Sequence, residues 1–149
     1  YGAPQNFEVD CWSLVINNFC LQAAQTNKIK INSEINTLRD FVTMTDTCEA
    51  IFLLMKYKIS HDEDCIFNVG GNWQKSILQI ANLIKERYYE TQKKNIEVFY
   101  KQNFIEQSDT FHFNLDKIID KGFKISDKKK ILEEIDSLIS FCIKHSASL

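Results

Sequence analysis

The sequence predicts an all-α, single-domain protein in which about five helices pack around one long central helix. Glycine and proline are rare, with 4 and 1 residues among 149, which disfavours a chain of strands and tight turns. Apolar residues recur at three- and four-residue spacing along much of the chain, as they do on helix faces. With 44% hydrophobic and 26% charged residues, the chain can bury a sizeable core as one domain over residues 1–149.

The central helix is predicted over residues 72–104, with a bend or break expected around residues 90–95, where the apolar spacing thins. Asn72 follows two glycines and is a favourable N-cap, and neither glycine nor proline interrupts the chain before Gly122. One face of this helix carries Trp73, Ile77, Ile80, Ile84, Tyr88, Thr91 and Val98. A second face carries Leu78, Tyr89, Ile96 and Tyr100. Because both faces are largely apolar, we expect neighbouring helices on both sides.

Two helices are expected ahead of the central one, over residues 6–25 and 32–57, with residues 26–30 as the turn between them. A short connector favours an antiparallel hairpin, in which the numbers of facing residues add to a constant. Cys11 and Cys48 are centred on this turn and should lie nearly opposite each other. The spacing therefore predicts a Cys11–Cys48 disulfide.

After a loop over residues 60–71 and the central helix, two more helices are expected. The first follows a cap at Ser108 or Asp109 and ends near Lys121, where Gly122 stands in the position of a C-terminal glycine. The last begins after a cap at Ser126 and carries the apolar stripe Ile131, Ile135, Leu138 and Cys142.

The cysteine content favours a secreted protein. Five cysteines are many for an intracellular helical protein, and the chain begins at Tyr1 without methionine, as after removal of a signal peptide, although a trimmed sequence would begin the same way. A second disulfide is expected among Cys20, Cys65 and Cys142, without a preference for one pairing.

Charge and motifs exclude several functions. The net charge of −2 gives no global attraction for nucleic acid, and the longest apolar run, residues 50–55, is too short to span a membrane. The acidic cluster at residues 61–65 lacks the spacing of a calcium or zinc site. No catalytic motif is present, and the glycines at residues 70–71 lack the spacing of a phosphate-binding loop. We therefore expect no metal, no cofactor and no enzymatic activity.

Surplus aromatic residues between residues 88 and 113 indicate either dense packing or a recognition surface. Tyr89 and Tyr100, with Lys93 beside them, are the candidate partner-binding residues, because they lie about half a turn from the central apolar stripe. The leading prediction is a secreted, effector-like or cytokine-like protein that binds another protein. The alternative is a carrier with a cavity between its helices for a small apolar molecule or lipid. A hydrolytic or redox enzyme is the least favoured function.

Overall fold

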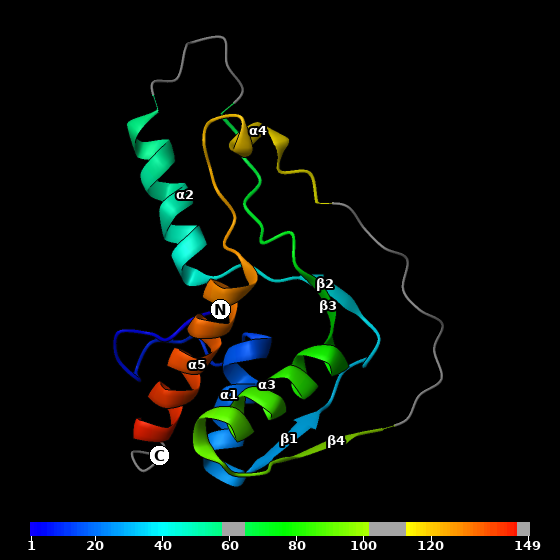
Figure 1. Ribbon diagram of the computed structural model, residues 1–149. Helices are drawn as coiled ribbons and strands as arrows, with labels where there is room; N and C mark the ends of the chain where they lie inside the picture. Colours follow the sequence, from blue (N-terminus) through cyan, green and yellow to red (C-terminus); the bar gives the residue numbers. More distant parts are fainter. Residues whose placement is uncertain (58–64, 102–112, 146–149) are drawn as a thin grey trace.

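A computed structural model describes residues 1–57, 65–101 and 113–145, and it shows a mixed α/β fold where the sequence predicted helices alone (Figure 1). Strands are interspersed with helices along the chain. In order, the elements are α1 (Val15–Thr26), β1 (Lys28–Ile31), β2 (Leu38–Asp40), α2 (Met44–Lys56), β3 (Gln74–Ser76), α3 (Ile77–Gln92), β4 (Glu97–Tyr100), α4 (Asp116–Ile119) and α5 (Lys128–His145).

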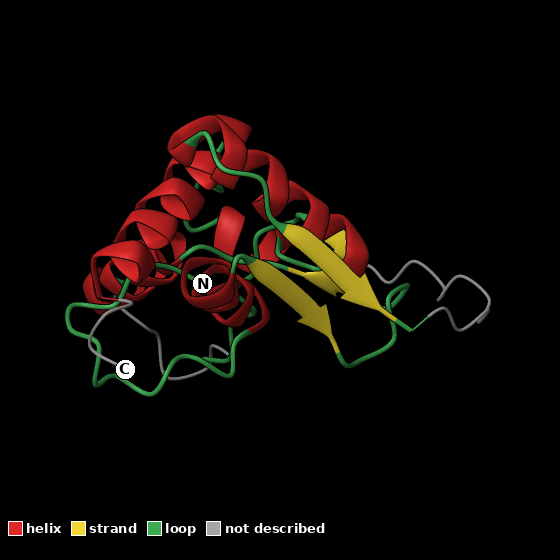
Figure 2. Cartoon of the chain, turned by 90° about the horizontal axis from the view of Figure 1, so that it is seen from below, coloured by secondary structure: helices red, strands yellow, loops and turns green. Residues whose placement is uncertain are grey.

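The four strands form two small sheets. β1 and β4 run parallel, with Lys28 opposite Glu97 and Ile31 opposite Tyr100, and Figure 2 shows two neighbouring arrows pointing the same way. β2 and β3 pair antiparallel, with Asp40 opposite Gln74. A parallel pair needs a long crossover connection. Here the crossover consists of β2, α2, β3 and α3.

The predicted first helix over residues 6–25 is wrong at both ends. The helix begins at Val15, and Leu14 occupies its N-cap position without a side-chain hydrogen bond. The predicted turn over residues 26–30 holds most of β1. In this strand Ile29 and Ile31 are buried while Lys28 and Lys30 are exposed, which is the period-two pattern of a half-buried strand.

The predicted second helix over residues 32–57 is also wrong, because its first half is loop and strand. Thr43 is the true N-cap of α2, and its hydroxyl accepts a hydrogen bond from the backbone of Asp46 at 2.9 Å. Ahead of it, β2 gains its hydrogen bonds from β3, which lies more than thirty positions further along the chain. This tertiary pairing outweighs the local helical spacing.

The long central helix over residues 72–104 is likewise wrong, since the helix in this range, α3, has only 16 residues. Residues 102–104 lie outside the described part of the chain. Ser76 and Gln79 form a capping box, so the N-cap lies four residues after the one expected at Asn72. Lys93 adopts a left-handed conformation with φ of 55° and ends the helix. The chain then turns back into β4. The stripe prediction is confirmed at Ile77, Ile80 and Ile84, which are all buried.

The main core lies between α1, α3, α5 and the inner face of β1. The predicted stripe of α5 is confirmed, because Ile131, Ile135, Leu138 and Cys142 are all buried. Asp127, and not the predicted Ser126, accepts the hydrogen bond from the Lys130 backbone in the first turn of this helix. At the surface, Arg87 of α3 forms an ion pair with Asp136 of α5 and ties the two helices together.

A second, smaller cluster joins α2 to α4. It contains Ala50, Leu115, Ile118 and Phe123. The predicted short helix from residue 108 survives only as α4, and its expected start lies outside the described residues. Gly122 does adopt a positive φ of 102°, and its N–H donates to the carbonyl of Ile119, as expected of a glycine that ends a helix.

The predicted disulfides are absent, since none of the five cysteines is bonded to another. Cys11 is buried in the loop before α1, where its sulfur accepts a hydrogen bond from Asn17, whereas Cys48 is exposed on α2. The hairpin geometry behind the Cys11–Cys48 pairing does not exist, because β1 and β2 intervene between the two helices. No described helix is both long and apolar enough to cross a membrane.

Candidate functional site

The most distinctive groove of the molecule lies where the parallel strands β1 and β4 end. It has a volume of about 360 Å³ and is lined by two short segments, residues 30–34 and residues 99–101. Because parallel strands end at the same edge of a sheet, the residues that follow them meet there. Ligands of open α/β sheets bind preferentially outside such carboxyl ends.

Local contacts fix the shape of this edge. The backbone N–H of Lys30 donates to the side-chain carbonyl of Gln22 on α1 at 2.8 Å, which holds the outer edge of β1 against the helix. On the exposed face, the Lys28 ammonium lies 5.6 Å from the centre of the Phe99 ring. The paired register of the two strands extends to Ile31 and Tyr100, which both line the groove.

The groove combines charge with exposed aromatic surface. Lys30 and Lys101 bring two ammonium groups, and Glu34 brings one carboxylate. Phe99 and Tyr100 are 47% and 44% exposed, which is high for large rings at the end of a strand. The remaining polar groups are the amide of Asn32 and the hydroxyl of Ser33. This set can bind an anionic group and stack on a flat ring at the same place.

A second groove, of about 680 Å³, runs between α3, α5 and the segment that contains β3. Its apolar lining includes Trp73, Leu83 and Leu132, and its polar rim includes Lys75 and Lys128. No residue lines both this groove and the one at the strand ends.

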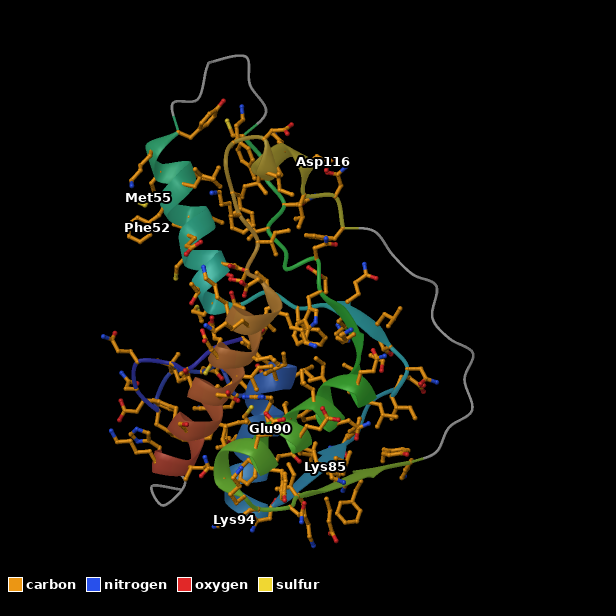
Figure 3. All side chains as sticks on the ribbon, in the orientation of Figure 1. Phe52, Met55, Lys85, Glu90, Lys94 and Asp116 are labelled. Carbon is orange, nitrogen blue, oxygen red and sulfur yellow. The ribbon has the colours of Figure 1, made fainter. Side chains whose placement is uncertain are left out.

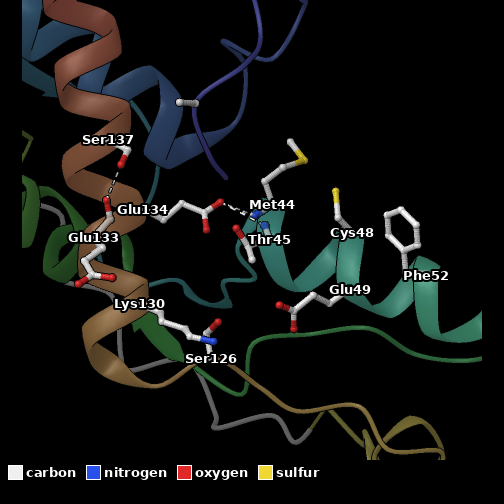
Figure 4. A pocket seen from close by; sticks show the side chains of 11 residues that line it. Met44, Thr45, Cys48, Glu49, Phe52, Ser126, Lys130, Glu133, Glu134 and Ser137 are labelled. Atoms are coloured by element: carbon white, nitrogen blue, oxygen red, sulfur yellow. Dashed lines mark hydrogen bonds between the residues drawn. The ribbon is translucent and has the colours of Figure 1, made fainter.

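A third groove, of about 640 Å³, separates α2 from α5 (Figure 4). Glu134 of α5 spans it and accepts hydrogen bonds from the backbone N–H groups of Met44 at 2.9 Å and Thr45 at 3.3 Å. A carboxylate at this helix start is favoured by the helix dipole, so the contact holds α2 in place. Further along α2, Phe52 and Met55 point away from the rest of the chain (Figure 3).

Cys20 and Cys142 are not suited to act as nucleophiles. Burial raises the pKa of the Cys142 thiol to about 12 and, together with Cys142, raises that of Cys20 well above its usual value. Both thiols are therefore protonated at neutral pH, and the thiolate is the reactive form. Among the described residues, no group of three or more His, Cys, Asp or Glu side chains could hold a metal ion.

Of the three residues predicted to bind a partner, Tyr89 and Lys93 lie together at the end of α3, and Tyr100 lies on β4. Tyr89 is half exposed in the last turn of α3, and its carbonyl accepts the N–H of Lys93 at 2.9 Å. Tyr100 lies on β4 and lines the strand-end groove instead. The sequence reasoning missed Lys30 and Asn32 altogether. The signal that could have found them is the alternation of lysine and isoleucine over residues 28–31, which indicates a strand.

The fold is similar to that of RMD from Pseudomonas aeruginosa, whose solved structure is a complex with NADPH. The two superpose with a TM-score of 0.69 and share 20% sequence identity, over 97% of this chain and 46% of RMD. The chain thus spans less than half the length of that protein. No protein-family model matches the sequence, and a comparison with curated proteins finds no relative.

This likeness corrects the predicted function. The predicted protein that presents a helix face to a partner and the predicted carrier with a cavity between its helices both rest on an all-α bundle stapled by disulfides. The described residues form one parallel and one antiparallel sheet, no disulfide joins the cysteines, and the fold is similar to that of a protein solved with NADPH. The effector-like, cytokine-like and carrier functions are therefore wrong.

Proposed function

We propose that this chain binds a nucleotide in the groove at the ends of β1 and β4, as part of a nucleotide-dependent oxidoreductase. The observation that carries the proposal is the meeting of lysines and exposed aromatic rings at the carboxyl edge of a parallel strand pair. The likeness to a protein solved with NADPH supports it, because that fold accommodates a nucleotide.

Each part of a nucleotide has a chemical counterpart in the groove. The ammonium groups of Lys30 and Lys101 attract phosphate oxygens as point charges. Phe99 and Tyr100 are consecutive in β4, so their side chains point to opposite faces, and Lys28 lies against the ring of Phe99. The ring of Tyr100 offers the flat surface on which a base can stack, a contact worth about 1–3 kcal/mol per base. Asn32 can both donate hydrogen bonds to ribose hydroxyls and accept them.

The proposal assigns binding, and not the transfer of a hydride, to the described residues. The chain corresponds to 46% of RMD, so the activity of a whole protein of that length extends beyond what these residues supply. Within the described part, the groove offers ammonium, amide, hydroxyl and aromatic groups that position a ligand.

Calorimetric titration of the chain with NADPH and with ADP tests the proposal. The double variant Lys30→Met with Lys101→Met removes both cations while keeping the length of the side chains. We expect its Kd to be at least tenfold weaker, because a single charge-assisted contact worth ~1.5 kcal/mol already corresponds to tenfold in affinity. Lys144→Met, in the last turn of α5 and exposed, is the matched control.

A second variant separates stacking from charge. Tyr100→Ala should weaken the binding of both nucleotides and leave the salt dependence of binding unchanged. The double lysine variant should instead reduce that salt dependence. Unchanged affinity in both variants, or no saturable binding by the parent chain, would refute the proposal.

A further inference from the structure

The groove between α3, α5 and β3 is a second candidate ligand site. Its volume of about 680 Å³ falls within the range of small-molecule sites, which are mostly apolar with a few convergent polar groups. We propose that it binds a flat apolar anion, such as an aromatic carboxylate, independently of the nucleotide groove. This inference goes beyond the proposed function and does not rest on it.

The apolar part of the groove is held in a fixed shape. The indole of Trp73 packs against Phe41 at 6.0 Å between ring centres, in an edge-to-face arrangement. Its backbone N–H donates to the carboxylate of Asp40 at 2.7 Å, so both the ring and its main chain are anchored. Leu83 and Leu132 line the same groove from α3 and α5. A ring that enters would meet a preformed apolar surface and would order few side chains on binding.

The charge at the rim favours an anion. Lys75 of β3 and Lys128 of α5 both line the groove, and neither forms an ion pair with a described residue. Their neighbour Lys129, by contrast, pairs with Glu133 at 3.7 Å. The one carboxylate in the lining, that of Glu86, leaves the rim with a net positive charge. An apolar ring with a single carboxylate therefore complements both the lining and the rim.

Trp73 provides a direct reporter, because the chain has only two tryptophans. The other, Trp12, packs against the rings of Phe7 and Phe141 and does not line the groove. In a Trp12→Phe variant the indole emission comes from Trp73 alone. We would titrate this variant with 2-naphthoate and with 2-naphthylmethanol, which has a similar shape and no charge. Calorimetry on the unsubstituted chain repeats both titrations and does not depend on that variant.

We expect 2-naphthoate to bind with saturation and to bind at least tenfold more tightly than the alcohol. The double variant Lys75→Met with Lys128→Met should abolish this preference and leave the affinity for the alcohol unchanged. The control Lys85→Met, at an exposed position of α3 outside the groove lining (Figure 3), should change the affinity for neither ligand. Leu132→Gln should weaken both ligands. Saturating ADP should not displace 2-naphthoate, which keeps this outcome separate from that of the nucleotide groove.

Three results would overturn the inference. They are the absence of saturable naphthoate binding by calorimetry, equal affinity for the acid and the alcohol, and displacement of naphthoate by ADP. Loss of nucleotide binding in the Lys30 and Lys101 double variant, with naphthoate binding retained, would support two independent sites.

Discussion

Removing the carboxylate of Asp40 tests how the loop at residues 71–73, just before β3, is held in place. This side chain accepts two backbone hydrogen bonds from distant residues, from Gly71 at 2.8 Å and from Trp73 at 2.7 Å. Hydrogen bonds to a charged group contribute about 1.5–3 kcal/mol each. The two bonds sum to about 3–6 kcal/mol. Because Asp40 is only half buried and water can partly replace it, we reduce this sum by about a third. Asp40→Ala should therefore destabilise the chain by about 2–4 kcal/mol.

The assay is thermal and urea unfolding of three variants. For a chain of this length, ~1 kcal/mol corresponds to roughly 2–4 °C, so Asp40→Ala should lower Tm by about 4–16 °C. Asp40→Asn keeps one acceptor oxygen and should lose roughly half as much. Asp10→Ala removes an exposed carboxylate and should stay within about 0.5 kcal/mol of the parent. A change in Asp40→Ala as small as that of Asp10→Ala would show that the loop is not held by this carboxylate.

Two further predictions concern the core and the thiols. Ile80 is fully buried on α3, so Ile80→Ala should cost about 2–5 kcal/mol in urea unfolding, and a loss below ~0.5 kcal/mol would contradict its position in the core. Under native conditions at pH 8, a thiol reagent should label the exposed Cys48 and Cys65 rapidly, and Cys20 and Cys142 only after unfolding, because burial both shields the latter two and raises their pKa. Rapid native labelling of Cys142, detected by peptide mapping, would speak against this arrangement.

The parts of the fold that could be predicted are those where local pattern and tertiary packing agree. The stripe of α5 is strongly periodic, and the helix covers the core with that same stripe. The first half of the expected central helix has the same property, and Ile77, Ile80 and Ile84 are buried as predicted. In both segments a sequence of helical period supplies its own hydrogen bonds, so no distant partner is needed.

The strands could not be derived in this way, because their hydrogen bonds come from elsewhere in the chain. β2 and β3 have three residues each, and neither has enough residues to show a period. β4 follows a helix that ends at Lys93 in a left-handed conformation, although lysine seldom adopts it and glycine usually marks such an end. Ser76 with Gln79 did carry a readable capping signature, but the neighbouring glycines drew the expected start to Asn72.

The same dependence on distant partners explains why the candidate site was missed. Lys30 and Lys101 belong to segments far apart in the sequence, and only the parallel pairing of β1 with β4 brings them to one edge. A net charge of −2 describes the whole surface and rules out strong long-range attraction of polyanions. It does not describe a groove whose lining includes two lysines, Lys30 and Lys101, and one glutamate, Glu34. A small phosphorylated ligand responds to that local excess, because charges beyond roughly 10 Å are screened at physiological salt. The net charge of the chain therefore disfavours binding of polyanions, while the local charge of the groove favours a small phosphorylated ligand, and the two statements do not contradict each other.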